Sequence, residues 1–184
     1  MSTLDFWRSE QGLEHITPRG KQWPEGDGFP RFIRRIAGEN VLEFGCGIGR
    51  LAECFDPAQY VGVDVSAHAV SLARKRLPQH LFFVVGDSEK LPTTTTTLAH
   101  TVLLHIPDGH LGATVARFTS PRVLVSEILG RAWRRTDSDP PAFNREAEEY
   151  ASAFAPRYKL ASSTTRPYPH YTETYMTLLE FEAC

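Results

Sequence analysis

"VLEFGCGIGR", residues 41–50, places three glycines within five positions directly after a short apolar run. The run 41–44 predicts a short buried strand, and the glycines predict a tight turn behind it. Gly45 and Gly47 let a ligand contact the main chain, because glycine carries no side chain. A helix predicted to begin near Gly49 would point its free N–H groups at the same place. The stretch therefore predicts a ligand-binding turn at the end of a strand.

Apolar runs alternate with helical patterns on both sides of this turn. Residues 29–37 have apolar side chains at helical spacing, and residues 60–65 and 81–85 are apolar runs that predict buried strands. Ser66 can cap a helix between these two strands, and Pro78 ends that helix. This order predicts a doubly wound, mainly parallel α/β sheet with right-handed crossovers.

Four further strands are predicted after residue 90. Residues 93–99, "TTTTTLA", are β-branched but hardly apolar, and the alternation alone supports a strand there. Residues 122–128 predict a fifth strand, and two more lie near 157–163 and 172–181. The last run alternates polar and apolar residues, which is typical of a half-exposed edge strand.

Polar residues follow the predicted strands at their carboxyl ends, where such sheets bind ligands. Asp64 ends the second strand, 19 residues beyond Gly45, the interval at which a carboxylate accepts hydrogen bonds from ribose hydroxyls. Asp87 and Ser88 follow the third strand, and His100 follows the fourth. Asp87 could accept a hydrogen bond from an exocyclic amine such as that of adenine. Together these positions predict a ligand that contains a nucleoside.

The details favour a nucleoside cofactor without a phosphate. The glycines follow G-x-G-x-G and precede Arg50, whereas the dinucleotide fingerprint has its third small residue one place later. Glu43 would place negative charge near a pyrophosphate. Both features disfavour NAD and suit S-adenosylmethionine (SAM), which has a sulfonium, an amino group and a carboxylate.

The motifs "VLEFGCGIGR", "VGVDVSAHAVSLAR", "GDSEKLP", "TVLLHIPD" and "RVLVSE" together resemble those of class I SAM-dependent methyltransferases, in particular the small-molecule, type 11-like subgroup. The resemblance covers about residues 29–130 and implies a seven-stranded, Rossmann-like sheet whose last strand is antiparallel. One departure is that threonines 93–97 replace the usual Phe-Asp pair before the fourth strand.

The resemblance also implies a set of cofactor contacts. It places the methionine part of SAM within residues 43–49, the ribose at Asp64, and the adenine at Asp87 and Ser88. The main chain of His100 would meet the SAM amino group. The implied cofactor-binding residues are Glu43, Gly45, Cys46, Gly47, Gly49, Asp64, Val65, Asp87, Ser88 and His100.

Composition excludes several other classes of protein. The 184 residues predict one domain, and a net charge of −2 argues against a long nucleic acid as partner. No apolar run is long enough to cross a bilayer, and the N-terminus lacks the order of a secretion signal, so we expect a soluble, cytoplasmic protein. Three cysteines without metal-like spacing argue against a disulfide framework. We expect no metal, and a monomer or homodimer.

No separate substrate domain fits this length. We expect an N-terminal arm or lid at 1–28, a SAM-binding core at 29–128, and a substrate-side segment with a C-terminal hairpin at 129–184. These outer segments supply the candidate substrate-binding residues Trp7, His15, Trp133, Tyr150, Arg166, Tyr168 and His170. The run "RAWRR" at 131–135 either binds an acidic substrate or forms a solvated surface.

The expected activity is methyl transfer to an oxygen or nitrogen of a small metabolite. His105 and His100 are the candidate proton acceptors, although positioning alone can supply much of the rate. Two alternatives stay open at this point. One is a non-catalytic SAM-binding interaction module, and the other is an NAD-dependent oxidoreductase.

Overall fold

The computed structural model describes residues 2–16, 28–86, 89–168 and 174–184. Its centre is a seven-stranded sheet in the order β3-β2-β1-β4-β5-β7-β6. The strands are β1 (Val41–Phe44), β2 (Tyr60–Asp64), β3 (Leu81–Val84), β4 (Thr96–His100), β5 (Arg122–Glu127), β6 (Tyr158–Pro167) and β7 (Tyr175–Ala183). The α-helices are α1 (Thr3–Arg8), α2 (Glu10–Ile16), α3 (Phe29–Ala37), α4 (Ala67–Arg76), α5 (Asp108–Val115) and α6 (Ala147–Phe154). Four short 3-10 helices are η1 (Ala52–Cys54), η2 (Pro57–Gln59), η3 (Leu103–His105) and η4 (Arg131–Trp133).

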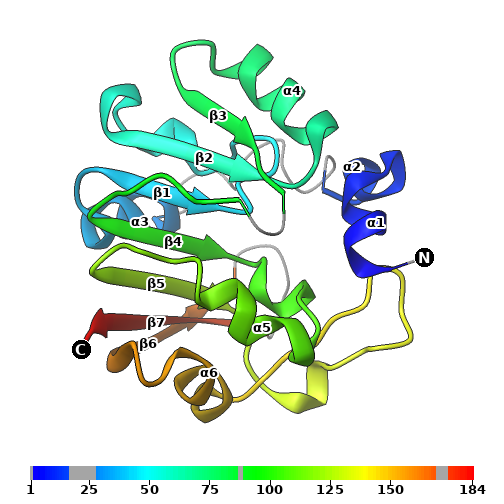
Figure 1. Cartoon of the computed structure of the whole chain (residues 1–184), viewed down its shortest axis with the longest axis vertical. Coiled ribbons are helices and arrows are strands. Elements are labelled where there is room, and N and C mark those ends of the chain that lie inside the picture. The colour runs from blue at the N-terminus through cyan, green and yellow to red at the C-terminus, as the bar shows by residue number, and fades with distance from the viewer. Residues whose placement is uncertain (1, 17–27, 87–88, 169–173) are drawn as a thin grey trace.

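The pairing of the strands confirms the predicted doubly wound sheet. β1 lies between β2 and β4, and the β1–β2, β1–β4, β2–β3 and β4–β5 pairs are all parallel. β7 runs antiparallel between β5 and β6. All five parallel strands consequently present their carboxyl ends along one edge, on the right in Figure 1.

Helices cover both faces of the sheet. Buried side chains of α3 and α4, such as Ile33 and Val70, belong to one apolar cluster with β1 and β2. Buried side chains of α5 and α6, such as Leu111 and Phe154, belong to a second cluster on the other face. The predicted helices at 29–37 and after Ser66 are confirmed, and the Ser66 hydroxyl accepts a hydrogen bond from the Ala69 N–H.

The threonine-rich stretch forms the central strand β4, which starts slightly later than predicted. Its threonines are buried because each hydroxyl finds a partner in the core. Thr96 Oγ1 donates to the Ala37 carbonyl at 3.0 Å, and Thr97 Oγ1 lies 2.8 Å from Ser120 Oγ. The core therefore tolerates threonine where an apolar residue would be expected.

Two burial predictions are wrong. β3 is an edge strand, and its Leu81 and Phe83 are 57% and 45% exposed, because no helix covers them in the described part of residues 85–95. β7 is interior and mostly buried, whereas β6 is the exposed edge strand. The alternating pattern of β7 predicted an edge strand, because the sequence alone does not show that β6 pairs with its outer side.

The helix predicted to begin near Gly49 is also absent. Residues 47–51 form turns, followed only by η1. Gly49 has a φ of +76°, a left-handed conformation that a right-handed helix cannot include. The start of this segment is therefore irregular, and we attribute no helix dipole to it.

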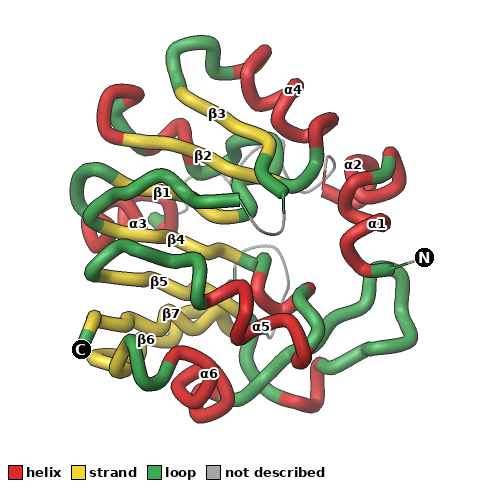
Figure 2. The backbone as a smooth tube through the Cα atoms, viewed as in Figure 1, coloured by secondary structure: helices red, strands yellow, loops and turns green. Residues whose placement is uncertain are grey.

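The described part of the N-terminal segment forms α1 and α2, which lie across from the carboxyl ends of the strands (Figure 1). Figure 2 shows that the long segment between β5 and α6 also reaches toward α1. Within the described ranges, no helix combines the length and apolar character needed to cross a bilayer.

Candidate active site

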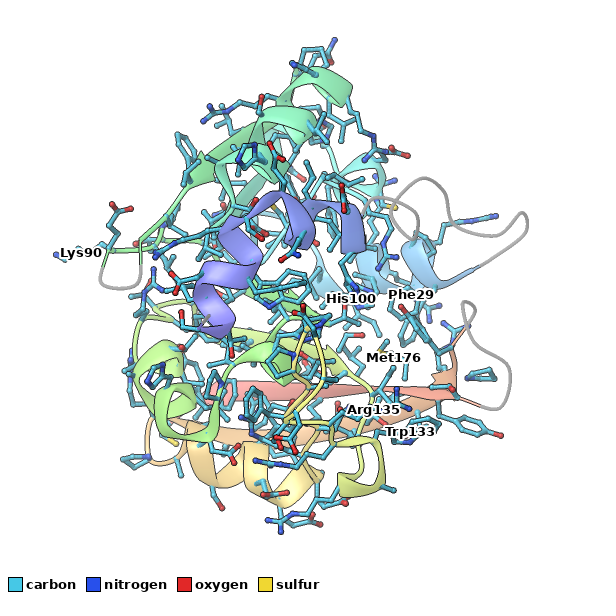
Figure 3. All side chains as sticks on the ribbon, turned by 90° about the vertical axis from the view of Figure 1, so that its right-hand side faces the viewer. Phe29, Lys90, His100, Trp133, Arg135 and Met176 are labelled. Atoms are coloured by element: carbon cyan, nitrogen blue, oxygen red, sulfur yellow. The ribbon has the colours of Figure 1, made fainter. Side chains whose placement is uncertain are left out.

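The carboxyl ends of β1, β2 and β4 open into a cavity of about 970 Å³. Its floor comes from these strand ends and the glycine turn, and its opposite wall comes from α1 and α2. Residues 133–144, which follow β5, contribute a third wall. Figure 3 looks onto this edge, with His100 near its centre and Trp133 and Arg135 on the side of the third wall.

The three glycines of the turn serve different purposes. All have positive φ, but a Cβ at Gly45 would lie 2.3 Å from Cγ2 of Val102, and one at Gly49 would lie 3.0 Å from the Phe82 ring. Gly47 instead lines the cavity, where the nearest atom to such a Cβ is Cδ1 of Ile16 at 3.5 Å. Gly45 and Gly49 are therefore required by packing as well as by backbone conformation, and Gly47 exposes main chain to the cavity.

Asp64 ends β2 with its carboxylate held by main chain. Oδ2 accepts from the Gly47 N–H and Oδ1 from the Ser66 N–H, both at 2.8 Å. Burial raises the pKa of Asp64, and these hydrogen bonds oppose the shift. Each carboxylate oxygen accepts more than one hydrogen bond, so Asp64 retains capacity for hydroxyl donors from the cavity that it lines.

Glu43 lies in β1 and is 4% exposed. The Tyr60 hydroxyl donates to Glu43 Oε2. Burial raises the pKa of Glu43 to about 8, against the opposing effects of the Tyr60 hydrogen bond and the Arg50 charge. Cys46, between the first two glycines, is also buried, and burial raises the pKa of its thiol, so its thiol is unsuited to act as a nucleophile.

His100 ends β4 within a chain of hydrogen bonds. Arg50 Nη2 lies 3.1 Å from His100 Nε2, and His100 Nδ1 lies 3.1 Å from Ser126 Oγ. A guanidinium can only donate, so Nε2 accepts and the ring proton belongs on Nδ1. The Nε2 lone pair of His100 is thus directed at Arg50.

Two buried polar side chains, Glu127 and Arg145, hold the loop that follows β4. Glu127 Oε1 accepts from the main-chain N–H groups of Val102, Leu103 and Leu104 at 3.1, 2.7 and 3.3 Å. Arg145, 2% exposed, donates to the Leu103 and Ile106 carbonyls. The 3-10 helix η3 is therefore fixed at both ends, and with it the position of His105.

His105 follows β4 and lines the cavity. Its Nδ1 is 2.9 Å from the Pro141 carbonyl, which only accepts, so Nδ1 carries the proton and Nε2 carries the lone pair of the neutral ring. The ring of Trp7 packs on His105 with centroids 4.6 Å apart, and His15 packs on Trp7 at 5.7 Å. The helices α1 and α2 thereby contribute an aromatic wall beside His105.

The structure places most of the predicted site residues around this one cavity. Those that line it are Glu43, Gly45, Cys46, Gly47, Asp64, Val65, His100, His105, Trp7, His15, Trp133 and Tyr168. Asp87, Ser88 and His170 lie outside the described residues.

Three predicted residues do not line the cavity. Gly49 packs on Phe82, Tyr150 is fully buried in the core beside Arg145, and Arg166 lies over the Phe32 ring at 4.3 Å. The predicted substrate contact at Tyr150 is wrong. Its side chain packs in the core, and no part of it reaches solvent.

Sequence reasoning assigned no ligand role to Arg50, although its position directly after the third glycine was a usable signal. It also missed Arg117, which lines the cavity and donates to the Gly86 carbonyl at 2.8 Å. Within the basic run at 131–135, Arg135 lines the cavity. Arg134 instead forms an ion pair with Asp108, and Arg131 one with Glu149. The basic run is therefore divided between surface ion pairs and the cavity wall.

Comparison with known proteins finds similarity over the part of the chain that holds this site. Residues 41–121 match the model of a family described as a methyltransferase domain. These residues are thus similar to a methyltransferase domain, in agreement with the predicted resemblance to class I SAM-dependent methyltransferases. The match spans β1 to the loop before β5 and thus includes the glycine turn, Asp64 and His100.

Two curated relatives are similar over part of the chain. A fatty-acid O-methyltransferase of Mycolicibacterium smegmatis is 30% identical over 115 residues, covering 54% of this chain and 41% of that protein. A trans-aconitate 2-methyltransferase of Afipia carboxidovorans is 29% identical over 108 residues, covering 55% and 41%. The chain thus spans about four-tenths of the length of these relatives.

Solved structures support the same fold over the whole chain. Magnesium protoporphyrin IX methyltransferase from Synechocystis with bound SAM superposes with a TM-score of 0.74 at 16% identity, covering 100% of this chain and 98% of that one. The [4+2]-cyclase SpnF superposes with a TM-score of 0.71 at 13% identity, covering 100% and 97%. At these identities the likeness shows the fold alone.

Proposed function

We propose that this chain transfers a methyl group from SAM to an oxygen or nitrogen of a small metabolite. The observation that carries the proposal is the arrangement of one cavity. The Asp64 carboxylate and the bare main chain of Gly47 line its floor, and His105 and Trp7 line its far wall. A cofactor site and an acceptor site would thereby share one cavity.

The residues on the floor fit the cofactor. A volume of about 970 Å³ lies at the upper end of the range typical of small-molecule pockets, with room for a cofactor and a small acceptor. Asp64 would accept from the ribose hydroxyls, and Gly47 would let the cofactor lie against the main chain. Asp87 and Ser88 are proposed to meet the adenine. SAM supplies a methyl group on a positively charged sulfur, which an electron-rich acceptor atom can take.

The residues of the far wall would act on the acceptor. His105 Nε2, with its lone pair, is the proposed proton acceptor when the nucleophile is a hydroxyl or an amine. Trp7 supplies an apolar ring, and its Nε1–H is buried with no hydrogen-bond partner among the residues that the structure describes. Trp133, on the third wall, and Tyr168 also line the cavity, and close packing around the acceptor would align it with the methyl group.

The names of the relatives support an oxygen acceptor. One is a fatty-acid O-methyltransferase, another acts on trans-aconitate, and a third group is named phthiotriol/phenolphthiotriol dimycocerosates methyltransferase. A carboxylate or hydroxyl oxygen is accordingly the first acceptor to test, with amines second.

The test measures release of S-adenosylhomocysteine (SAH) from SAM with a panel of small carboxylic acids, alcohols, phenols and amines. We expect release that depends on one chemical class of acceptor and falls sharply in the Asp64→Asn variant. Asp56→Asn is the matched control, because Asp56 is exposed, lies outside the cavity, and caps η2 in a way that asparagine can also cap.

The alternative functions predict other results. A protein that binds SAH but methylates nothing in the panel would favour a SAM-binding interaction module. Binding of NADH without binding of SAM would favour an oxidoreductase and contradict the proposal.

A further inference from the structure

The basic run that follows β5 contains three arginines, and the structure gives them different surroundings. Arg131 forms an ion pair with Glu149, and Arg134 forms one with Asp108. Arg135 lines the cavity, and its guanidinium has no ion pair or hydrogen bond among the residues that the structure describes. The sequence alone did not decide whether this run binds an acidic substrate or forms a solvated surface. Of the three arginines, Arg135 is the candidate for binding a ligand.

The direction of the Arg135 side chain follows from the extended backbone on which it lies. The Arg135 N–H donates to the Ala142 carbonyl at 2.8 Å, and the Ala142 N–H donates back at 2.9 Å, so the two residues close a short antiparallel hairpin. Successive side chains of an extended backbone point to opposite sides. Arg134 turns to Asp108 and to the Phe143 ring, and Arg135 consequently turns to the other side, where the cavity lies.

The same hairpin is attached to the loop that carries His105. The Phe143 N–H donates to the Leu104 carbonyl at 2.6 Å, and His105 Nδ1 donates to the Pro141 carbonyl at 2.9 Å. The Cα atoms of a hydrogen-bonded antiparallel pair are about 5.5 Å apart, so Arg135 lies one strand spacing from the residue that follows Pro141. A ligand whose nucleophilic atom faces His105 would therefore have the Arg135 side chain within reach of its other end.

The other charged groups of the cavity differ from Arg135 in their partners. Arg50 donates to His100, and Arg117 donates to main-chain carbonyls beyond β3. Asp139 lines the cavity on the same wall as Arg135 and is exposed, and within the described ranges no ion pair joins these two residues. An anionic ligand would therefore meet the Arg135 guanidinium without first displacing a carboxylate of the protein.

We infer that Arg135 binds a carboxylate of the methyl acceptor. The inference rests on the proposed function and narrows the acceptor to a small molecule that carries a carboxylate and a separate nucleophilic oxygen or nitrogen. The planar N–H donors of a guanidinium match a carboxylate, and they occupy its lone pairs, so the atom that receives the methyl group is a different one, near His105. Trp133, beside Arg135 in Figure 3, also lines the cavity and would pack on the apolar part of the acceptor.

The experiment compares acceptors that differ only in the charge of one group. Each hydroxy acid, amino acid and dicarboxylic acid of the panel is paired with the amide of one carboxylate, such as 4-hydroxybenzoate with 4-hydroxybenzamide and succinate with succinamate. Release of SAH gives kcat and KM for both members of each pair on the wild-type chain, Arg135→Met, Arg135→Lys and Asp139→Asn. Arg131→Met is the matched control, because Arg131 belongs to the same basic run but does not line the cavity. Calorimetry with SAH checks that each variant keeps its cofactor site.

We expect the wild type to favour the acid over its amide by about 10- to 100-fold in kcat/KM, the size of a charge-assisted contact. Arg135→Met should lose most of this preference through a higher KM for the acid, with kcat nearly unchanged, because the contact is the same before and during methyl transfer. Arg135→Lys should keep part of the preference, since it retains the charge but not the planar fork. Asp139→Asn should keep or increase the preference, because it removes a negative charge from the same wall.

Three results would overturn the inference while the proposed function stands. Methylation of neutral acceptors with no preference for any acid would show that the site does not select a carboxylate. A preference that survives in Arg135→Met would place the carboxylate elsewhere, and equal losses for the acid and its amide would make Arg135 a structural residue. A wild-type chain that binds SAH but methylates nothing in the panel would refute the proposed function and the inference together.

Discussion

Glu43 and Glu127 are two buried glutamates of the same sheet that serve different ends. They are 4% and 0% exposed, and burial raises the pKa of each to about 8. Glu43 receives a hydrogen bond from Tyr60 and lines the cavity. Glu127 does not line the cavity and instead receives the N–H groups of three consecutive residues before and within η3.

This difference shows that a perturbed pKa does not by itself mark a ligand site. Desolvation causes the shift in both glutamates, and only their partners separate a group that faces ligands from one that supports the fold. Glu127 affects the site indirectly, because Glu127 and Arg145 together hold the loop that carries His105. The comparison predicts that Glu43 variants change ligand binding and that Glu127 variants change stability first.

Asp64, a third carboxylate of the sheet that is only half-buried, extends the comparison and has the largest expected effect. Asp64→Ala would remove two charge-assisted hydrogen bonds to the ribose, each worth about 1.5 to 3 kcal/mol. We expect the affinity for SAH, measured by calorimetry, to fall by about 100-fold or more. Unchanged affinity in a folded variant would place the nucleoside elsewhere.

Glu127→Ala should cause the largest loss of stability. It leaves three main-chain N–H groups without their acceptor, so we expect the free energy of unfolding to fall by about 3 to 5 kcal/mol. Glu43→Ala leaves only the Tyr60 hydroxyl without its partner and should cost about 1 to 3 kcal/mol. Denaturant unfolding of both variants measures the difference, and equal losses would contradict the comparison.

The pH dependence of stability tests whether the glutamates are protonated in the folded state. Between the ordinary value of 4.5 and about 8, the folded chain keeps a proton at Glu127 that the unfolded chain has lost. The free energy of unfolding should therefore fall as pH rises through this window, by up to about 1.4 kcal/mol per pH unit, and level off above pH 8.

Glu127→Gln removes this linkage, because the amide stays neutral at every pH. Relative to the wild type, we expect this variant to gain stability steadily from pH 5 to pH 8, and Glu43→Gln to behave alike. The exposed residue Glu148 supplies the control, since Glu148→Gln should leave the slope unchanged. Parallel curves for Glu127→Gln and the wild type would show that Glu127 is ionised in the folded protein.

We expect His105→Ala to have the smallest effect on stability, because the half-buried hydrogen bond to the Pro141 carbonyl is worth about 1 kcal/mol and the remaining loss is packing of the ring on Trp7. If His105 accepts the proton, turnover should fall by at least about tenfold while the affinity for SAH stays nearly constant. Measuring turnover, affinity and melting temperature on this one variant separates the roles. A less stable but fully active variant would remove His105 from the catalytic residues.

Local pattern was enough to predict several parts of the site. The strand at 41–44, its glycine turn, and Asp64 at the end of the next strand depend on short-range order, and parallel strands must bring such ends to one edge. The buried threonines of β4 gave a weaker signal, because their hydroxyls are satisfied by Ala37 and Ser120, 59 and 23 residues away.

The sequence by itself determined the type of sheet, the succession of its parallel strands along the chain, and the turn and carboxylate that face the cavity, because these follow from periodicity and from the few possible strand connections. Only the tertiary structure decided that Gly45 packs on Val102, that Arg50 meets His100, and that Glu127 supports η3 rather than a ligand. It also decided that β3 is exposed and Tyr150 buried. These outcomes depend on side chains that are far apart in the chain and become neighbours only on folding, so no local pattern of residues records them.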